Sequence, residues 1–236
     1  MVSVVLPVYD ERDNLEPLLR EIDAALRGVT YEILAVDDGS TDGSLEELER
    51  LKADHPALRI IALGRNCGQS AAFAAGFDAA GGDVVVTMDA DGQNVPADVP
   101  SLLGELERSP ELTAVVGYRV RRADSRWKLV QSKVANTVRN WITGDTVRDT
   151  GCSLKAMRRA AAVRLPRFDG MHRFLPTLLR AHGGIVVERP VSHRPRRHGR
   201  TKYGMWNRAA RGLRDAFWVR GYRRRALAEK PRDPAS

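Results

Sequence analysis

Residues 83–94, with the sequence DVVVTMDADGQN, decide the expected fold class. The run from Val84 to Met88 is apolar and rich in β-branched residues, and it is too short for a helix. We therefore expect a fully buried strand here, preceded by the turn signal Gly81-Gly82 and followed at once by acidic residues.

The sequence around this strand alternates between expected strands and helices. A pattern of Ser44 with Glu47 three residues later is typical of a capping box at a helix start. In the first half we expect strands at 2–8, 32–37, 58–63 and 83–88, with helices at 14–27, 44–54 and 68–80. Further on we expect strands at 114–118, 150–156 and 185–191, with helices at 125–142 and 175–181. This order predicts an α/β protein with a doubly wound, mainly parallel sheet.

Two carboxylates follow the buried strand, at Asp89 and Asp91. In an open α/β sheet, ligands bind outside the carboxyl ends of the strands. Residues two apart in an extended segment point to the same side, so both side chains can face one bound group. Two such oxygen donors suit Mg²⁺ or Mn²⁺, and Gln93 could add a carbonyl oxygen. Acidic pairs also form solvated turns and caps, and the position after a buried strand is what favours a ligand site.

Size and composition describe an ordinary globular chain. With 236 residues, 43% hydrophobic and 29% charged, we expect one large domain with an appendage. Cys67 and Cys152 give neither a disulfide framework nor a metal-ligand spacing. No signal peptide and no run of 18 apolar residues is visible, so we expect a cytoplasmic chain that does not cross a bilayer.

Charge is divided unevenly along the chain. Residues 1–115 contain 8 Lys and Arg against 22 Asp and Glu, a net charge of −14. Residues 116–236 contain 30 Lys and Arg against 8 Asp and Glu, a net charge of +22. This separation predicts an acidic half that holds a cation and a basic half that meets anions, such as nucleic acid, a membrane surface or phosphorylated substrates.

The first two expected strands end in residues that suit a nucleotide. Neither G-x-G-x-x-G nor a Walker A sequence is present, which argues against a dinucleotide oxidoreductase and a P-loop NTPase. Tyr9 could pack against a base, and Asp38 could accept hydrogen bonds from a base or ribose. Glu11 and Asp38 share a sheet edge with the carboxylates of 89–91, so we expect them to contact ligand. We expect turn and cap roles for Ser40, Thr41 and Asp42.

Four segments in order carry a family resemblance: LPVYDERDNL, EILAVDDGSTDGS, GRNCGQSAAFAAGFDAAGGDVVVTMDADGQN and RHGRTKYG. Over residues 2–220 the chain resembles the inverting glycosyltransferases of family two with a GT-A fold. Within them it resembles the dolichol-phosphate mannose synthase-like enzymes, which glycosylate polyprenyl phosphates. The resemblance implies a GDP- or UDP-linked sugar donor and a nucleotide-sugar pocket formed by Pro7, Tyr9, Glu11, Asp37, Asp38 and Asp89.

The resemblance also implies a division of catalytic roles. Asp89 and Asp91 would be the D-x-D pair, and Gln93 would help to hold the metal. A divalent ion between Asp91 and the diphosphate would neutralise charge on the leaving group. Attack from the opposite face of the sugar would invert the anomeric centre through an oxocarbenium-like transition state.

A polyprenyl phosphate acceptor is already anionic and needs cations rather than a general base. The resemblance assigns Arg119, Lys128 and Ser132 to the acceptor phosphate, and Arg119 joins Asp89 and Asp91 as the expected catalytic set. Arg196 and Lys202 correspond to a loop that closes over the donor or acceptor. Lys128 stands where some relatives have Arg, which replaces a bidentate fork by a point charge.

We expect a catalytic domain at 1–204, divided into a nucleotide-sugar and metal half at 1–115 and an acceptor half at 116–204. The acceptor half includes an interface helix near 172–182 and a basic loop at 193–204. A basic amphipathic helix at 205–226 and a disordered tail at 227–236 would follow. Apolar faces bordered by arginine suit an anionic leaflet, so we expect a peripheral protein on the inner face of the membrane. The end of the sequence, where many relatives add membrane-spanning helices, supports the same expectation.

Two alternatives stay open. A family-two enzyme with a saccharide hydroxyl acceptor would need a general base, for which Asp149 is the fallback, although a cap or ion pair is the reading we favour for that residue. The basic half could instead be a nucleic-acid-binding module, but Arg and Lys without a reading motif are weak support. We therefore expect no nucleic acid partner.

Overall fold

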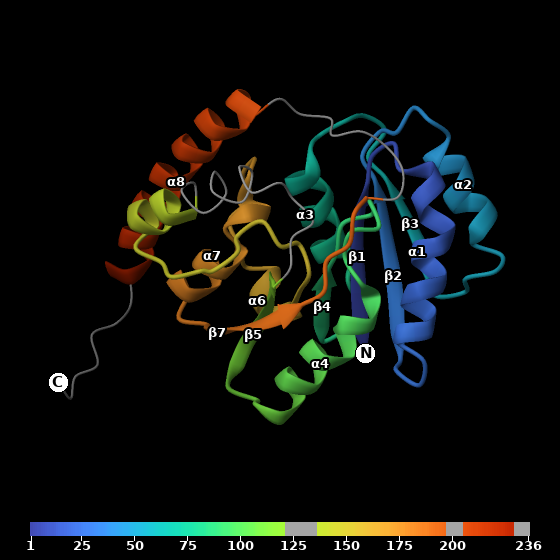
Figure 1. Ribbon diagram of the computed structural model, residues 1–236, viewed down its shortest axis with the longest axis horizontal. Helices are drawn as coiled ribbons and strands as arrows, with labels where there is room; N and C mark the ends of the chain where they lie inside the picture. Colours follow the sequence, from blue (N-terminus) through green and yellow to red (C-terminus); the bar gives the residue numbers. More distant parts are fainter. Residues whose placement is uncertain (121–135, 197–204, 229–236) are drawn as a thin grey trace.

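The computed structural model describes residues 1–120, 136–196 and 205–228, which form one sheet with helices on both faces (Figure 1). Within these residues the sheet has the strand order β3-β2-β1-β4-β6-β5-β7. β6 is antiparallel to both of its neighbours, and the other neighbouring pairs are parallel. The strands are β1 (Val2–Val8), β2 (Tyr31–Asp37), β3 (Leu58–Ala62), β4 (Val84–Thr87), β5 (Leu112–Arg119), β6 (Lys155–Arg158) and β7 (Ile185–Val191). The predicted mainly parallel α/β sheet is confirmed.

The helices alternate with the strands in the first half as predicted, although the sequence pattern did not predict those at Val99–Arg108 and Arg159–Ala162. They are α1 (Arg12–Ala25), α2 (Ser44–Leu51), α3 (Gln69–Ala79), α4 (Val99–Arg108), α6 (Arg159–Ala162), α7 (Leu175–Ala181) and α8 (Met205–Ala228), with short 3-10 turns η1 (Pro96–Asp98) and η2 (Met171–Arg173). A further helix covers 136–143, within the range where a helix was expected. Among the described helices, none combines the length and the hydropathy that crossing a membrane requires.

Each face of the sheet has its own apolar core. In α1, Leu15, Leu18, Leu19 and Ile22 recur at helical spacing, and they pack with apolar residues of α2 and α4 against one face. On the other face, α3, α7 and α8 cover the same strands through Phe73, Phe77, Leu178 and Val219, among others. The apolar residues of α7 are buried in this core, so the membrane-facing helix expected near 172–182 is wrong. Two covered faces explain why the central strands are apolar on both sides.

A close approach between α3 and β1 sets the position of the site. A Cβ added to Gly76 would lie 2.2 Å from Cγ1 of Val5, so only glycine lets the helix lie this close to the strand. The amino end of α3 is thereby held beside the carboxyl end of β1. The chain winds from β1 outward through β2 and β3, then returns to place β4 on the other side of β1. This reversal is a topological switch point, where open α/β sheets bind ligands.

The predicted capping box at the start of α2 is wrong. The helix is preceded by Gly43, and Oγ of Ser44 donates to Oδ1 of Asp42 (2.5 Å) while accepting from the Glu11 amide (3.0 Å). The Ser44 hydroxyl therefore holds the loop after β1 rather than the first turn of its own helix.

Candidate functional site

The loop after β1 is fixed by side chains that follow β2. Asp10 has φ 48°, a left-handed conformation that Asp tolerates better than most residues. Its amide donates to Oγ of Ser40 (3.0 Å), and its Oδ1 accepts from the amide of Thr41 (2.7 Å). Asp42 accepts from the Arg12 amide at the start of α1 (3.1 Å). The turn and cap roles expected for residues 40–42 are confirmed, and together they orient Tyr9 and Glu11 at the sheet edge.

Asp37 and Asp38 end β2 and are both buried, but they hold different segments. The carboxylate of Asp37 accepts from the Gly39 amide (3.2 Å) and from the Ser40 amide, which closes its own turn. Asp38 accepts from the amides of Cys67 (2.6 Å) and Gly68 (2.9 Å), just before α3. Burial raises the pKa of Asp38, and these two hydrogen bonds oppose the shift. Asp38 therefore joins the β2 edge to the amino end of α3.

Asp89 lies directly beyond β4 and is held from two directions. Its Oδ1 accepts from Nε2 of Gln69 (2.7 Å), the first residue of α3, and its amide donates to Oδ1 of Asn94 (3.1 Å). Burial, and then the neighbouring Asp91, raise the pKa of Asp89 to about 6, against the hydrogen bond from Ser153. A cation bound near both carboxylates would offset the repulsion between Asp89 and Asp91 and stabilise the charged form of Asp89.

Asp91 already contacts a cation. Its Oδ1 accepts from the Gln93 amide (3.0 Å), and its Oδ2 forms an ion pair with Nη2 of Arg196 (2.8 Å). Nη1 of the same guanidinium lies 3.5 Å from Oε1 of Glu11. The loops after β1 and β4 thus present two carboxylates that share one positive group.

The segment before Arg196 lies across the loop that contains these carboxylates. Asn94 and His193 form an isolated antiparallel bridge, and the Arg194 amide donates to the carbonyl of Gln93 (3.1 Å). The guanidinium of Arg194 contacts the carbonyl of Gly92 and forms a two-point ion pair with Glu21 (2.8 and 3.0 Å). The first part of the predicted basic loop therefore reaches the predicted metal site.

Four residues that the sequence analysis did not select support the carboxylates. They are Gln69, Asn94, Ser153 and Lys155. Oγ of Ser153 donates to Oδ1 of Asn94 (2.7 Å), the same oxygen that accepts from the Asp89 amide. The ammonium of Lys155 is buried and donates to the carbonyl of Cys152, while its charge lowers the pKa of Asp89. Burial in turn lowers the pKa of Lys155. The signal for Lys155 was a single lysine among apolar neighbours in an expected strand.

Arg119 ends β5 and is bound by Asp149. Its Nε and Nη2 donate to the two carboxylate oxygens of Asp149 at 2.6 and 2.8 Å, and each side chain is only 13% exposed. The Asp149 carboxylate also accepts from the amides of Arg119 (3.3 Å) and Gly151 (3.1 Å). The ion pair that we favoured for Asp149 is confirmed.

The other predicted site residues divide into two groups. Pro7 lies within β1, in register with Val36 of β2, so it belongs to the same edge as Tyr9. Lys128, Ser132 and Lys202 lie outside the described residues, as does the expected tail beyond residue 228.

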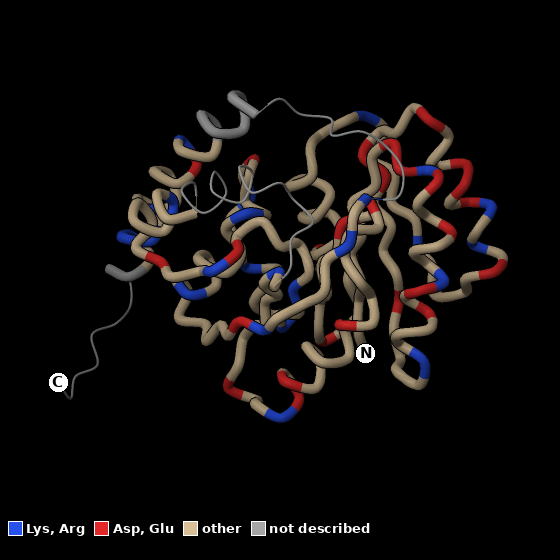
Figure 2. Tube along the Cα trace, in the orientation of Figure 1, with Lys and Arg blue, Asp and Glu red and all other residues tan. Residues whose placement is uncertain are grey.

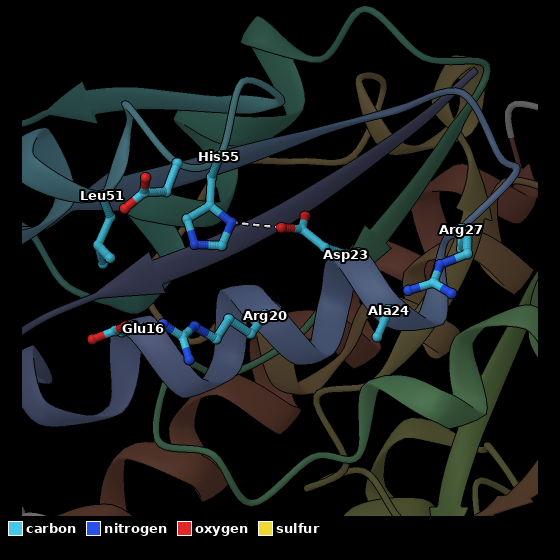
Figure 3. A pocket seen from close by; sticks show the side chains of 8 residues that line it. Glu16, Arg20, Asp23, Ala24, Arg27, Leu51 and His55 are labelled. Carbon is cyan, nitrogen blue, oxygen red and sulfur yellow. Dashed lines mark hydrogen bonds and ion pairs between the residues drawn. The ribbon is translucent and has the colours of Figure 1, made fainter.

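A hollow of about 460 Å³ lies on another part of the molecule, beside α1 and residues 51–55 (Figure 3). There Nδ1 of His55 lies 2.5 Å from Oδ2 of Asp23, and the hydroxyl of Tyr31 donates to Oδ1 of Asp23 (2.6 Å). Burial and this Asp23 contact raise the pKa of Tyr31 to about 12. None of the predicted site residues lines this hollow, so we assign it a structural role.

The sequence that contains these carboxylates matches a known family. The model of glycosyl transferase family 2 matches residues 3–165, and the chain belongs to this family. Its fold is the GT-A type that the resemblance predicted.

Three known proteins illustrate the similarity. The chain is 39% identical over 213 residues to a dodecaprenyl-phosphate galacturonate synthase of Rhizobium johnstonii, covering 86% of this chain and 62% of the relative. It is 40% identical over 206 residues to an undecaprenyl-phosphate 4-deoxy-4-formamido-L-arabinose transferase of Pseudomonas fluorescens, covering 86% of this chain and 60% of the relative. A solved structure of glucosyl-3-phosphoglycerate synthase from Mycobacterium tuberculosis with Mn²⁺, uridine diphosphate and glucosyl-3-phosphoglycerate superposes with TM-score 0.71 at 18% identity, covering 94% and 79% of the two chains. The chain spans about three fifths of the length of the two curated relatives.

Proposed function

We propose that this chain is an inverting glycosyltransferase that moves one sugar from a nucleotide-sugar donor to a polyprenyl phosphate. The observation that carries the proposal is the group of carboxylates at the ends of β1, β2 and β4, two of which already share one guanidinium. Both curated relatives named above are, by their names, polyprenyl-phosphate sugar transferases, which supports the acceptor class.

The donor would lie along the switch point. Tyr9 and Pro7 would contact the base, Asp38 the base or ribose, and Asp37 would keep the turn behind them closed. Glu11 and Asp89 would face the sugar and the diphosphate. The donor screen described below would show whether the donor nucleotide is GDP or UDP.

The residues present fit a divalent cation. Within the described residues no three His, Cys, Asp or Glu side chains are placed to hold a metal ion by themselves, so donor phosphates would complete the ligand set. Asp91 would hold Mg²⁺ or Mn²⁺, with Asp89 and Gln93 beside it. The ion pair between Arg196 and Asp91 supports this position, because it places a positive charge on the same carboxylate. When bound, the ion would neutralise charge on the departing diphosphate.

The acceptor phosphate would meet the basic side of the site. The two hydrogen bonds from Arg119 to Asp149 already hold the guanidinium in one orientation. Arg119 would therefore lose little side-chain entropy when it binds the acceptor phosphate. Lys128, Ser132 and Lys202 would add contacts, and Arg196 would move from Asp91 toward donor or acceptor as the metal binds. An acceptor that is already anionic needs no general base, so the chain's own residues have only to orient it.

A hydroxyl acceptor is the less favoured reading. It would need a carboxylate with freedom to take a proton, and both oxygens of Asp149 accept from the Arg119 guanidinium. Such an ion pair stabilises the charged form and makes Asp149 a poor base.

The membrane surface is part of the proposal. Leu213 and Phe217 on α8 are 44% and 58% exposed, so the apolar face expected at the start of this helix does not pack on the domain at these positions. A basic helix with an exposed apolar face suits an anionic leaflet, and we place the protein peripherally on the inner face of the membrane.

A donor screen tests the function. Purified protein would be given GDP- and UDP-linked sugars, a short-chain polyprenyl phosphate and Mn²⁺ or Mg²⁺, and the glycolipid would be read by mass spectrometry. We expect product with one donor class, dependent on metal and abolished by EDTA, and an inverted anomeric configuration by NMR. Product on a saccharide with none on the phospholipid would replace this proposal by the hydroxyl-acceptor reading.

A further inference from the structure

A second positively charged concavity lies away from the switch point. The helix at 136–143 and the later part of α8 enclose a surface hollow of about 250 Å³, whose lining includes Trp141, Gly144, Arg220, Arg223 and Arg224. These two segments lie side by side in Figure 1, where the shorter helix is yellow and α8 is red. Among the described residues of the proposed donor, metal and acceptor sites, none lines this hollow.

Arg223 forms the fixed part of this hollow. Its Nη1 donates to the carbonyl of Thr143 (2.6 Å) and to that of Gly144, at the carboxyl end of the helix at 136–143. Carbonyls at a helix end have no partner within the helix and carry partial negative charge, so a guanidinium is a stabilising neighbour. Gly144 has φ 65°, and a Cβ there would lie 2.8 Å from Nη1 of Arg223. Arg223 therefore has a structural role and joins the two segments.

Arg220 and Arg224 leave a positive charge that the fold does not compensate. They are four residues apart on α8, so they neighbour each other on one helix face, an arrangement that costs free energy. Among the described residues neither forms an ion pair, and no acidic side chain lines the hollow. Asp145, which follows the hollow in sequence, is already paired with Arg180. An anion that contacts both guanidinium groups would remove their repulsion.

The surroundings of the hollow indicate where this anion is found. Trp141 is 76% exposed, and Phe217 lies on the same face of α8 as Arg220 and Arg224. Ala216 and Val219 of the same helix are buried against the domain, so the hollow lies at the edge of the face that packs. Exposed aromatic rings beside arginines are typical of proteins that rest at the headgroup level of a bilayer.

We propose that this hollow binds the headgroup phosphate of an anionic phospholipid, with Arg220 and Arg224 as ligands and Trp141 at the level of the headgroups. The site rests on the membrane contact in the proposed function and names its ligand, but it is separate from the acceptor site and requires no sugar transfer. Because Arg223 joins α8 to the helix at 136–143, a lipid bound in this hollow would fix one contact point between the protein and the bilayer.

Vesicle binding by the full chain tests this site. We would compare phosphatidylcholine vesicles with and without phosphatidylglycerol, for the wild type and the double variant Arg220→Gln/Arg224→Gln. Two arginines near a charged surface correspond to a loss of about 30-fold in affinity for the anionic vesicles. The control Arg214→Gln/Arg225→Gln removes the same charge from exposed positions of the same helix outside the hollow, and we expect a loss of only about three-fold.

Three outcomes would overturn the site. The first is an equal loss in both double variants, which would mean diffuse attraction along α8. The second is unchanged vesicle binding in Arg220→Gln/Arg224→Gln. The third is a loss of oligonucleotide affinity at physiological salt in Arg220→Gln/Arg224→Gln with vesicle affinity unchanged, which would favour nucleic acid as the ligand of the hollow.

Two further readings separate this site from the proposed function and from misfolding. Circular dichroism and thermal unfolding of Arg220→Gln/Arg224→Gln should match the wild type, and so should sugar transfer to a short-chain acceptor in detergent. Lipid binding with no transfer in the wild type would count against the proposed function alone. For Trp141→Ala we expect weaker binding to both vesicle types with the anionic preference kept, and an unchanged affinity would contradict the placement of Trp141.

Discussion

The two halves of the sheet differ in the source of the arginines that pair with their acids. At the ends of β1, β2 and β4, carboxylates accept from backbone amides, as Asp38 does from residues 67 and 68, and the arginine that pairs with Asp91 comes from the basic half. Around β5, α7 and α8, the acids pair with arginines of their own half, as Asp149 does with Arg119 and Asp145 with Arg180. In the backbone trace of Figure 2, Asp and Glu positions are frequent along α1 and α2, and Lys and Arg positions are frequent around α7 and the described part of α8.

This difference shows how a chain of net charge +8 can serve two ligands of opposite sign. Amides orient a carboxylate without cancelling its charge, so the acidic edge stays attractive to a cation. A paired acid orients an arginine and cancels one unit of charge. Because the basic half has few acids, only some arginines are fixed in this way, and others such as Arg220 remain available to anions.

The largest expected effect is that of Asp91→Asn, which tests the acidic edge. Loss of this charge should weaken Mn²⁺ binding and lower kcat by at least about 100-fold, because the leaving diphosphate would lack its counter-ion. Calorimetric Mn²⁺ titration in the presence of donor nucleotide and steady-state turnover are the measurements. Asp78→Asn, an exposed acid on α3 paired with Arg167, is the matched control and should change neither quantity. Normal turnover in Asp91→Asn would remove the basis of the comparison.

The basic edge is tested by Arg119→Lys and Asp149→Asn. Lysine cannot replace a two-point guanidinium contact, and asparagine leaves Arg119 without its orienting charge. Both variants should raise KM for the polyprenyl phosphate by about 10- to 100-fold, with KM for the donor and the Mn²⁺ affinity unchanged. Arg27→Lys, an exposed position on the acidic half, serves as control. If kcat fell while KM for the acceptor stayed constant, Asp149 would regain its place as a candidate base.

Much of the fold could be predicted because its signal is local. The bounds of β1, α7 and β7 agree with expectation, since apolar or β-branched residues begin each element and turn or loop residues follow it. α4 was missed, because Pro100 and Gly104 interrupt its pattern although its buried residues keep helical spacing. β6 begins at Lys155, later than expected, since pairing with Thr87 of a distant strand sets its start.

The site was predictable to the extent that its residues follow strands. Asp38, Asp89 and Asp91 lie just beyond the carboxyl ends of β2 and β4, as the expected strands implied, and their roles stay predictions. Gln69 and Asn94 acquire their roles only when α3 and the loop after β4 meet in the folded chain, which no sequence pattern marks. The contact of Arg196 with Glu11 and Asp91 was also unforeseen, because it joins residues 185 and 105 positions apart.

A smaller effect should come from Arg196→Gln, which tests whether Arg196 of the basic half competes with the metal ion for Glu11 and Asp91. If the guanidinium occupies the position of the metal, its removal should raise Mn²⁺ affinity in the absence of donor by about three- to ten-fold. Turnover should fall, since the residue would no longer contact donor or acceptor. Arg194→Gln, which contacts Glu21 rather than Asp91, is the matched control. Unchanged or weaker Mn²⁺ binding in Arg196→Gln would show that the ion pair does not compete with metal.

The smallest expected effect comes from Glu32, an acid of the same half that lies away from the site. Its Oε1 accepts from Oγ of Ser3 (2.6 Å) and from the Gly81 amide (2.7 Å), and Arg59 pairs with Oε2. Burial alone would raise the pKa of Glu32, but these hydrogen bonds and Arg59 lower it below its usual 4.5. Glu32→Gln should therefore lower the free energy of unfolding at pH 7 by about 1–3 kcal/mol, with Mn²⁺ affinity unchanged.

The stability difference between the wild type and Glu32→Gln should depend on pH. A carboxylate with a lowered pKa in the folded state stabilises the protein above its unfolded pKa and loses that contribution as the pH falls through the folded value. The gap in unfolding free energy between wild type and Glu32→Gln should thus shrink below about pH 4.5, and urea unfolding at several pH values measures it. A difference that is constant with pH would mean that Glu32 acts through packing. A change in Mn²⁺ affinity would mean that residues at the amino ends of the strands also influence metal binding.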